Sequence, residues 1–353
     1  MTVGIRSIAK HLGVSVSTVS SVVNDRGYVS PQMRKRVEEY LRKIDYQPNY
    51  VARSLRRQET RIIGLIVPDL VNFFYTELSR AAEDFLLASG YQLIVADSRE
   101  DWKRQQDYLT TFCRMMTDGI LLVPSPATDA QIASIPAMVR GRPLVYLDRS
   151  PVGSPVDAVL IDNHKAAFAA TRHLIEKGHR RIAIITEPLN LLCAADRLEG
   201  YRQVLEDHQI LVDPELIHIG GNTKESAYEI GLRLLARRDR PTAAVVCNNQ
   251  MTLGFLKALR ECNVACPDEF SVVGFDECDW SEHMQPPLTT IRQPAAEMGA
   301  TAARVLLARL SDRRETPPTT TILGFHLVER SSTAVYAPEV RPEDLIRSDK
   351  AAG

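Results

Sequence analysis

Short polar side chains that could bind phosphate are concentrated near the N-terminus. Ser15, Thr18, Ser20 and Asn24 lie within ten residues of one another, and their hydroxyl and amide groups suit hydrogen bonds to phosphate oxygens. Residues 1–61 also carry twelve Lys and Arg against five Asp and Glu, whereas the other 292 residues carry a net charge of −8. A basic segment joined to an acidic body favours a polyanion as partner of that segment, although a solvated basic surface would have the same composition.

Three short helices are expected to position these side chains. Gly13 can end the first helix in a left-handed conformation, and Ser15 can cap the second, which runs to about Asn24. Ser30-Pro31 is a typical start for the third. Apolar residues at helical spacing define an inward face on each helix: Ile8 and Leu12, then Val19, Val22 and Val23, then Met33, Val37, Leu41 and Ile44.

The first two helices and the turn at 13–15 have the length of a helix-turn-helix, which places the start of its second helix in the DNA major groove. At about 100° per residue, Ser17 and Ser21 point away from the buried valines, and Val16 in the first turn can also project outward. A purely structural three-helix bundle is the alternative that this pattern leaves open.

From Arg61 onward the pattern changes to apolar runs of strand length separated by amphipathic helical stretches. The runs are 62–67, 91–96, 119–123, 143–147, 158–161, 181–185, 243–247 and 270–275. The helical stretches are 75–89, 100–116, 163–177, 196–208, 224–236, 250–262 and 294–311. This alternation predicts parallel sheets covered on both faces, and the number of strands favours two α/β subdomains over an eight-repeat barrel.

The sequence lacks the signals that are typical of several classes of protein. No apolar run approaches the roughly 18 residues of a transmembrane helix, and residues 1–14 hold no apolar signal segment, so we expect a cytoplasmic protein with no membrane partner. No Walker A loop, GxGxxG, GxSxG or HExxH motif is found, and the six cysteines lack metal-ligand spacing. We therefore expect no metal and no cofactor. Two alternatives to a DNA-binding protein remain: an enzyme without a recognisable local motif, and a carbohydrate-binding transport protein.

Five sequence pieces carry a specific family resemblance. They are VS-x-x-TVS at 14–20, Asn24, YVS at 28–30, YQPN-x-VARSL at 46–55 and IGLIVPD at 63–69. Together they resemble the N-terminal signature of LacI/GalR-family transcriptional regulators, and the resemblance continues in order to about Arg330.

The resemblance implies a small all-α helix-turn-helix DNA-binding domain followed by an α/β, two-lobed, periplasmic-binding-protein-like (Rossmann-like) sensor. The expected segments are a DNA-binding domain at 1–47, a hinge at 48–60, the sensor at 61–337 and a loose tail at 338–353. The first lobe would comprise 61–161 and 294–321, and the second 162–290 and 323–337, with the three crossings near Asp162, Ile291 and Ile322. The implied function is a sequence-specific repressor that binds a near-palindromic operator duplex as a homodimer, under control of a small-molecule effector.

The resemblance also assigns roles in DNA binding. Val16, Ser17 and Ser21 would read base edges, while the short donors Ser15, Thr18, Ser20 and Asn24 would contact phosphates. Many relatives carry a long side chain where this chain has Ser21, so its half-site is expected to differ. In the hinge, Leu55 would enter the minor groove as a wedge, with Ala52, Arg53 and Arg56 around it; an ordinary basic linker is the alternative.

Motif-matched positions define an expected effector site between the lobes: Asn72, Phe73, Phe74, Asp148, Arg197, Asn222, Asn248 and Asp276. Aromatic faces, an arginine fork and carboxylates would suit a polyol, although each residue taken singly could be structural. Leu191, Leu192 and Asn249 depart from the polar residues of relatives, which suggests a more apolar pocket. A sugar or sugar derivative is the first expectation for the effector, and a purine-type corepressor is the second.

Overall fold

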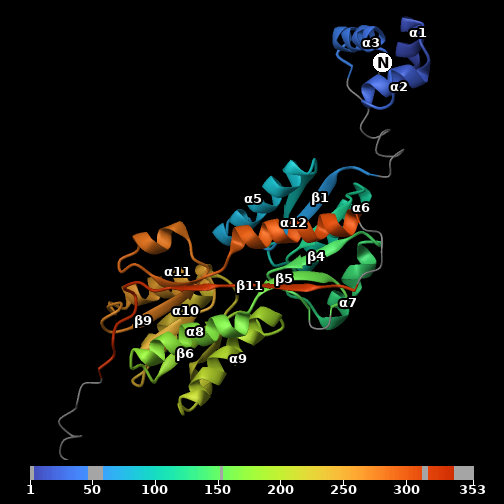
Figure 1. The fold of residues 1–353 in the computed structure, drawn as a ribbon. Helices are drawn as coiled ribbons and strands as arrows, with labels where there is room; N and C mark the ends of the chain where they lie inside the picture. The colour runs from blue at the N-terminus through green and yellow to red at the C-terminus, as the bar shows by residue number, and fades with distance from the viewer. Residues whose placement is uncertain (1–3, 47–58, 152–153, 312–316, 338–353) are drawn as a thin grey trace, which may run out of the picture. The chain divides into compact units, whose positions relative to one another are not determined.

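The computed structural model describes residues 4–46, 59–151, 154–311 and 317–337 and divides the chain into two compact units, Met1–Thr60 and Arg61–Gly353 (Figure 1). The first unit is called the head and the second the body below. The hinge residues Ala52, Arg53, Leu55 and Arg56 lie outside the described residues, as does the expected tail.

The head contains the three expected helices, α1 (Ile5–Leu12), α2 (Val16–Val23) and α3 (Pro31–Lys43). Gly13 ends α1 with φ 63°, and the Ser15 hydroxyl accepts the Thr18 amide at the start of α2, so both predicted caps are confirmed. A small apolar core holds the three helices together: Ile8, Ala9, Leu12, Val19, Val22 and Val37.

The first lobe of the body is built on a six-stranded parallel sheet, ordered β11-β5-β4-β3-β1-β2. Its strands are β1 (Ile62–Val67), β2 (Gln92–Asp97), β3 (Gly119–Leu122), β4 (Leu144–Leu147), β5 (Asp157–Ile161) and β11 (Thr320–Leu323). Its helices are α5 (Phe73–Ala88), α6 (Trp102–Arg114), α7 (Asp129–Met138) and α12 (Ala295–Ser311). The central strands β3 and β4 are wholly buried, as expected for strands covered on both faces.

The second lobe repeats this plan with a sheet ordered β12-β10-β9-β8-β6-β7, in which β12 alone is antiparallel to its neighbour. Its strands are β6 (Ile182–Thr186), β7 (Ile217–Ile219), β8 (Ala243–Val246), β9 (Ser271–Phe275), β10 (Thr289–Arg292) and β12 (His326–Val328). Its helices are α8 (Asn163–Glu176), α9 (Leu192–Asp207), α10 (Lys224–Leu235) and α11 (Asn249–Glu261), with short turns η1 (Pro214–Leu216) and η2 (Asp279–His283). Two separate sheets confirm the prediction of two subdomains and exclude the barrel.

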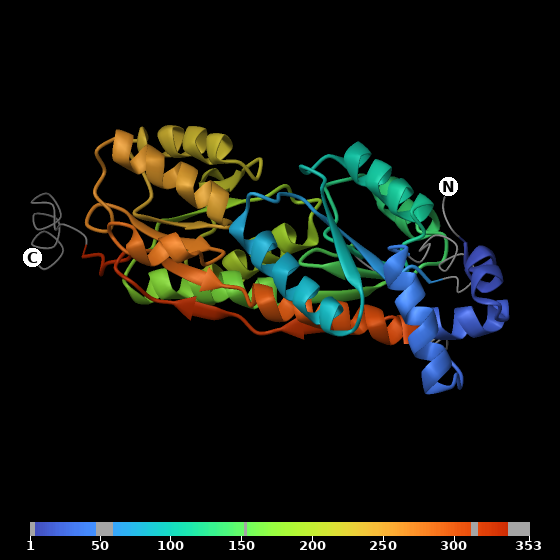
Figure 2. The ribbon, with the colours of Figure 1, turned by 90° about the horizontal axis from the view of Figure 1, so that it is seen from above.

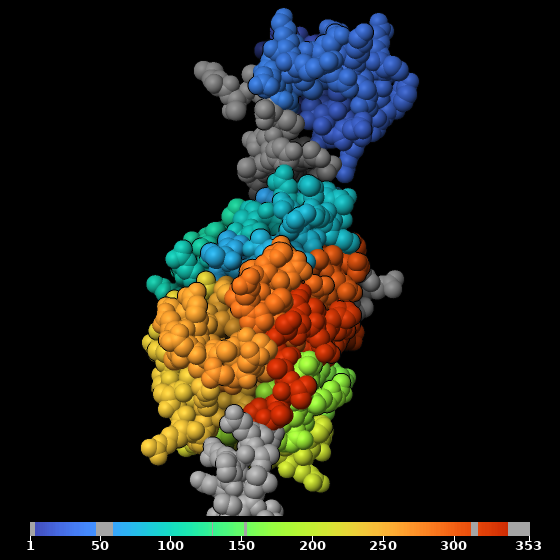
Figure 3. Space-filling view, turned by 90° about the vertical axis from the view of Figure 1, so that its left-hand side faces the viewer, coloured from blue at the N-terminus to red at the C-terminus, as the bar shows by residue number. Residues whose placement is uncertain are grey.

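The chain passes between the two sheets three times, at 162, at 293–294 and at 324–325. Ile291 and Ile322, expected near the second and third crossings, lie inside strands two residues before them, where they pair with Phe275 and Leu160. Leu323, expected in the second lobe, belongs to the first sheet. Figure 3 shows the red segment that carries the last crossing on the surface of the body, between green and orange residues.

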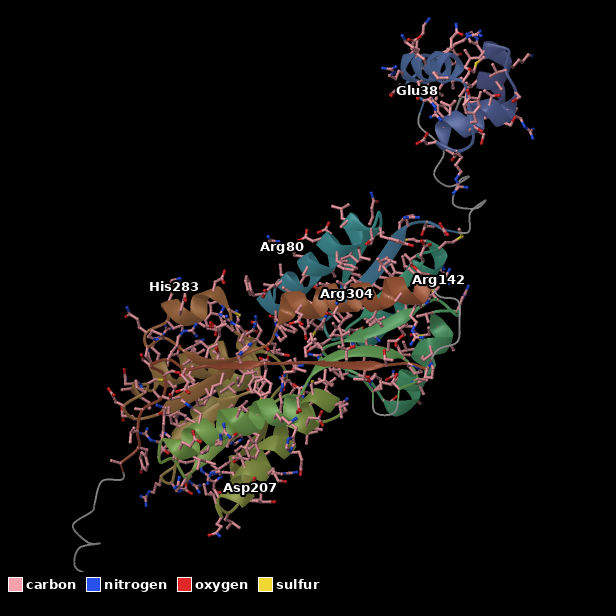
Figure 4. The ribbon with its side chains drawn as sticks, viewed as in Figure 1. Glu38, Arg80, Arg142, Asp207, His283 and Arg304 are labelled. Atoms are coloured by element: carbon pink, nitrogen blue, oxygen red, sulfur yellow. The ribbon has the colours of Figure 1, made fainter. Side chains whose placement is uncertain are left out.

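Three helix pairs pack closely in the body: α5 with α12, α8 with α9, and α10 with α11. In the first pair, seen side by side in Figures 1 and 2, a Cβ on Gly299 would lie 2.1 Å from the Leu78 carbonyl oxygen. The guanidinium of Arg304, which is labelled on α12 in Figure 4, lies 5.4 Å from the ring centroid of Phe85 on α5. Glycine is therefore required where the backbones of α5 and α12 meet.

We expect Gly299→Ala to destabilise the body by about 1–3 kcal/mol, because the added methyl group would push α12 away from α5. Gly324→Ala is the matched control, since a Cβ at Gly324 meets nothing within 4 Å. Urea unfolding of the two variants measures the difference. Equal free energies of unfolding for both variants would contradict the close approach.

Candidate functional site

The exposed face of α2 carries the residues expected to read DNA bases. Val16 and Ser17 are exposed and Ser21 is half-buried, whereas Val19 and Val22 are buried in the core of the head. The helix therefore presents the side that its apolar pattern predicted. Recognition of DNA bases by these residues remains a prediction.

The expected phosphate-binding residues already have partners within the head. The Ser15 hydroxyl lies 2.7 Å from the Ser17 hydroxyl and 2.8 Å from that of Thr18. The Asn24 amide donates to the carbonyl oxygen of Ser20 at 2.7 Å, across the last turn of α2. These bonds give the residues a structural role as caps, and their phosphate contacts stay a prediction. Seven basic side chains of the head are exposed: Arg6, Lys10, Arg26, Lys35, Arg36, Arg42 and Lys43.

A cavity of about 550 Å³ lies between the two lobes of the body. Seven of the eight expected effector residues line it: Asn72, Phe74, Asp148, Arg197, Asn222, Asn248 and Asp276. Phe73 is not among the lining residues and is 38% exposed. Phe74 and Tyr75 of α5 are buried and line the cavity, whereas Phe73, about 100° around the helix from Phe74, does not.

The ends of parallel strands place these side chains, as is usual for ligand sites in α/β sheets. Asn72 and Asn248 cap helices that follow strands β1 and β8, accepting the amides of Phe74 at 3.0 Å and Met251 at 2.7 Å. Asp148 follows β4, the fourth strand of the first sheet along the chain. Asp276 follows β9, which is the fourth strand of the second sheet. The two lobes therefore present one aspartate each to the cavity.

Two buried arginines on the cavity wall are held by glutamates. Arg149 binds both carboxylate oxygens of Glu100, at 2.7 and 2.8 Å. Arg197 donates to Glu187 at 2.8 Å and to Asn163 at 2.8 Å. A buried arginine and a carboxylate offset the desolvation of each other only when paired in this way. Arg149 Nε also lies 3.7 Å from Asp148 Oδ2 in an ion pair, but among the described residues neither arginine donates a hydrogen bond to Asp148 or Asp276.

The aspartates have neutral partners instead. Tyr75 donates its hydroxyl to Asp148 at 3.0 Å, and the Gln293 amide donates to Asp276 at 2.6 Å. Burial raises the pKa of Asp276 to about 6, against the opposing effect of Arg197. A buried carboxylate with few donors favours ligands that bring hydrogen-bond donors of their own.

Four further residues that line this cavity were not predicted from the sequence: Tyr75, Glu100, Arg149 and Glu187. Glu187 follows β6 directly, so the strand-end pattern could have located it, whereas Glu100 reaches the cavity only through the tertiary fold. Leu191 and Leu192 are not among the residues that line the cavity, and a pocket more apolar than that of relatives stays a prediction. Arg197 lies inside α9, which begins at Leu192 and not near residue 196.

Comparisons with known proteins agree with this architecture. Residues 4–49 match the family model described as bacterial regulatory proteins, lacI family, and residues 171–333 match that of a periplasmic binding protein-like domain. The transcriptional regulator RegA of Clostridium saccharobutylicum is 33% identical over 335 residues, which cover 94% of this chain and 100% of RegA. The chain belongs to the lacI family. It is thus a DNA-binding transcriptional regulator with a helix-turn-helix head and a sensor body.

Other members of the lacI family extend the comparison. The transcriptional repressor PurR of Vibrio atlanticus (strain LGP32) is 31% identical over 309 residues, which cover 88% of this chain and 92% of PurR. The lac repressor dimer bound to operator and the anti-inducer ONPF has a TM-score of 0.84 at 27% identity, covering 95% of this chain and 100% of that chain. A complex of the regulator CelR with cellobiose has a TM-score of 0.70 at 31% identity, covering 94% and 99%.

Within 4–46, 59–151, 154–311 and 317–337, no helix is both long and apolar enough to cross a membrane. In the same ranges, no group of three or more His, Cys, Asp or Glu residues is arranged to hold a metal ion.

We expect Ser21→Arg to change the base preference of this lacI-family regulator, because arginine can bind guanine through two hydrogen bonds in the major groove. Selection of duplexes from a random pool, with the wild type and the variant in parallel, measures the preferred half-site. Ser7→Arg on α1 adds the same charge elsewhere in the head and should leave the consensus unchanged. One consensus shared by the wild type and Ser21→Arg would refute the assignment.

Proposed function

We propose that the body binds a neutral, hydroxyl-rich effector, a sugar or sugar derivative, and that its binding sets the affinity of the head for operator DNA. The observation that carries this proposal is the pair of buried aspartates, Asp148 and Asp276, one on each lobe of the same cavity. Hydroxyl groups can donate to both carboxylates at once, so a polyol would hold the two lobes together.

The charge of the cavity supports a neutral effector. Its lining contains six acidic side chains, Asp69, Asp97, Glu100, Asp148, Glu187 and Asp276, and three basic ones, Arg99, Arg149 and Arg197. A phosphate or carboxylate on the ligand would meet this excess of negative charge at low dielectric, which is unfavourable. A sugar carries no charge and avoids this repulsion.

A purine-type corepressor is the second candidate. The rings of Phe74 and Tyr75 both line the cavity, with their centroids 5.0 Å apart and their planes at 73°. A flat base could pack against one of these rings. The sugar remains the first proposal because aromatic rings also cover the apolar face of a sugar, whereas the many acceptors on the cavity wall require several donors.

The remaining parts of the proposal follow from the family. We infer that the regulator acts by binding, without a catalytic step, as a homodimeric repressor in the cytoplasm where operator DNA is found. The lac repressor described above is a dimer on its operator, and two heads on one near-palindromic duplex would give each half-site one α2 helix.

Thermal unfolding of the full chain with cellobiose, ribose, ribose 5-phosphate or hypoxanthine tests the effector class. We expect a neutral sugar to raise the Tm, since a ligand at about 100 times its Kd stabilises the folded state by about 2.7 kcal/mol. Asp276→Asn should reduce this stabilisation, and Asp207→Asn on the exposed end of α9 should not. Stabilisation by the phosphate ester but by neither neutral sugar would overturn the proposal.

Sugar binding should also depend on pH through Asp276. Burial raises its pKa to about 6, so the carboxylate is ionised and accepts hydroxyl donors above that pH, and it is protonated below. The affinity measured by calorimetry is therefore expected to fall as the pH is lowered through 6. Asp276→Asn should bind more weakly and lose this transition, and a transition that persists in the variant would contradict the assignment.

A further inference from the structure

Unusual backbone conformations are concentrated at the interlobe cavity. Twelve non-glycine residues of the described chain have left-handed φ angles, and five of them line this cavity: Arg99, Glu100, Asp148, Asn222 and Asp276. Such conformations cost free energy and persist where the surrounding structure enforces them, often at functional sites. Glu100 and Asn222, at φ 55° and 59°, meet each other directly across the two lobes.

The contact between Glu100 and Asn222 depends on Arg149. The Asn222 amide of the second lobe donates to Glu100 Oε1 of the first lobe at 3.1 Å. The same Oε1 accepts Arg149 Nη2 at 2.8 Å, and Glu100 Oε2 accepts Arg149 Nη1 at 2.7 Å. The guanidinium fork thus fixes the carboxylate that reaches the opposite lobe, a geometry that lysine cannot reproduce.

The Nε atom of Arg149 has no acceptor among the described residues. The Arg149 side chain is only 8% exposed. The nearest carboxylate oxygen in an ion pair with Nε, Asp148 Oδ2, lies 3.7 Å away, beyond hydrogen-bond distance. Asn222 Oδ1, on the other side of the contact, is likewise buried and without a partner among the described residues.

We propose that Arg149 couples effector recognition to lobe closure. Its Nη atoms hold Glu100 against Asn222, and its Nε donates to an effector hydroxyl that in turn donates to Asp148. A hydroxyl oxygen about 2.8 Å from both atoms satisfies the donor and the acceptor together. This assignment rests on the proposed function, and it makes Arg149 a residue that distinguishes a hydroxyl at this position from a hydrogen atom or an anion.

Two measurements on the full chain test the two parts of this coupling. Calorimetry with cellobiose and with ribose should show an affinity about ten- to hundredfold lower for Arg149→Lys, the effect of losing hydrogen bonds to a charged group. Hydrogen–deuterium exchange without sugar should become faster at 98–101 and 220–223, because the interlobe contact is weakened. Arg172→Lys, on the exposed surface of α8, is the matched control for both measurements.

Asn222→Gly tests the contact if Arg149→Lys fails to fold. Glycine adopts the left-handed backbone of this position readily, and the variant removes the amide while leaving Arg149 in place. We expect faster exchange at 98–101 and a smaller loss of sugar affinity than in Arg149→Lys.

The outcomes separate this coupling from the proposed function. If the wild type binds neither sugar while exchange still accelerates in the variants, the sugar assignment fails and the interlobe contact stands. If folded Arg149→Lys binds the sugars as the wild type does, Arg149 does not read the effector. If neither Arg149→Lys nor Asn222→Gly changes the exchange at 98–101, the interlobe contact is refuted.

Discussion

Two like charges from opposite lobes share one buried cavity, and this constraint organises the body of the molecule. Asp148 and Asp276 are 5% and 6% exposed, and the arginines beside them are paired with Glu100 and Glu187. Carboxylates repel each other at low dielectric unless donors are placed between them. The lobes can therefore close tightly only around something that supplies those donors, which is the physical basis of a sensor.

Few covalent connections join the two lobes. Only three crossings join the two sheets, at 162, 293–294 and 324–325. Gln293, which donates to Asp276, lies in the second of these crossings. A ligand shifts an equilibrium between open and closed forms by the difference between its affinities for the two forms. The contacts among Arg149, Glu100 and Asn222 add a link between lobes that an effector could strengthen.

The sequence predicted those features that depend on local pattern. The caps at Gly13 and Ser15, eight of the twelve strands of the described residues and the polar residues at strand ends follow from spacing and residue type alone. The place of Phe74, and not Phe73, on the cavity wall depends on the true start of α5, which the apolar pattern had placed at residue 75. The contact between Glu100 and Asn222 joins residues 122 positions apart through left-handed backbone, and no local signal encodes such a pairing.

The structure also changes how the cavity should be tested by mutation. Arg197→Ala is the variant that the sequence suggests, with loss of the effector response as its expected result. Arg197 is paired with buried Glu187, however, so its removal would leave an unpaired buried charge and disturb the fold. Asp276 offers a cleaner test, because its partner Gln293 is neutral.

The central claim is that binding of an effector in the interlobe cavity changes the affinity of the head for operator DNA. Fluorescence anisotropy of a labelled, selected operator duplex, titrated with the full chain in the presence and absence of the sugar that stabilises it, measures this directly. The account predicts a shift in the operator Kd that saturates with the sugar and is reduced in Asp276→Asn. An operator Kd that stays the same while calorimetry shows the cavity to be saturated would contradict it.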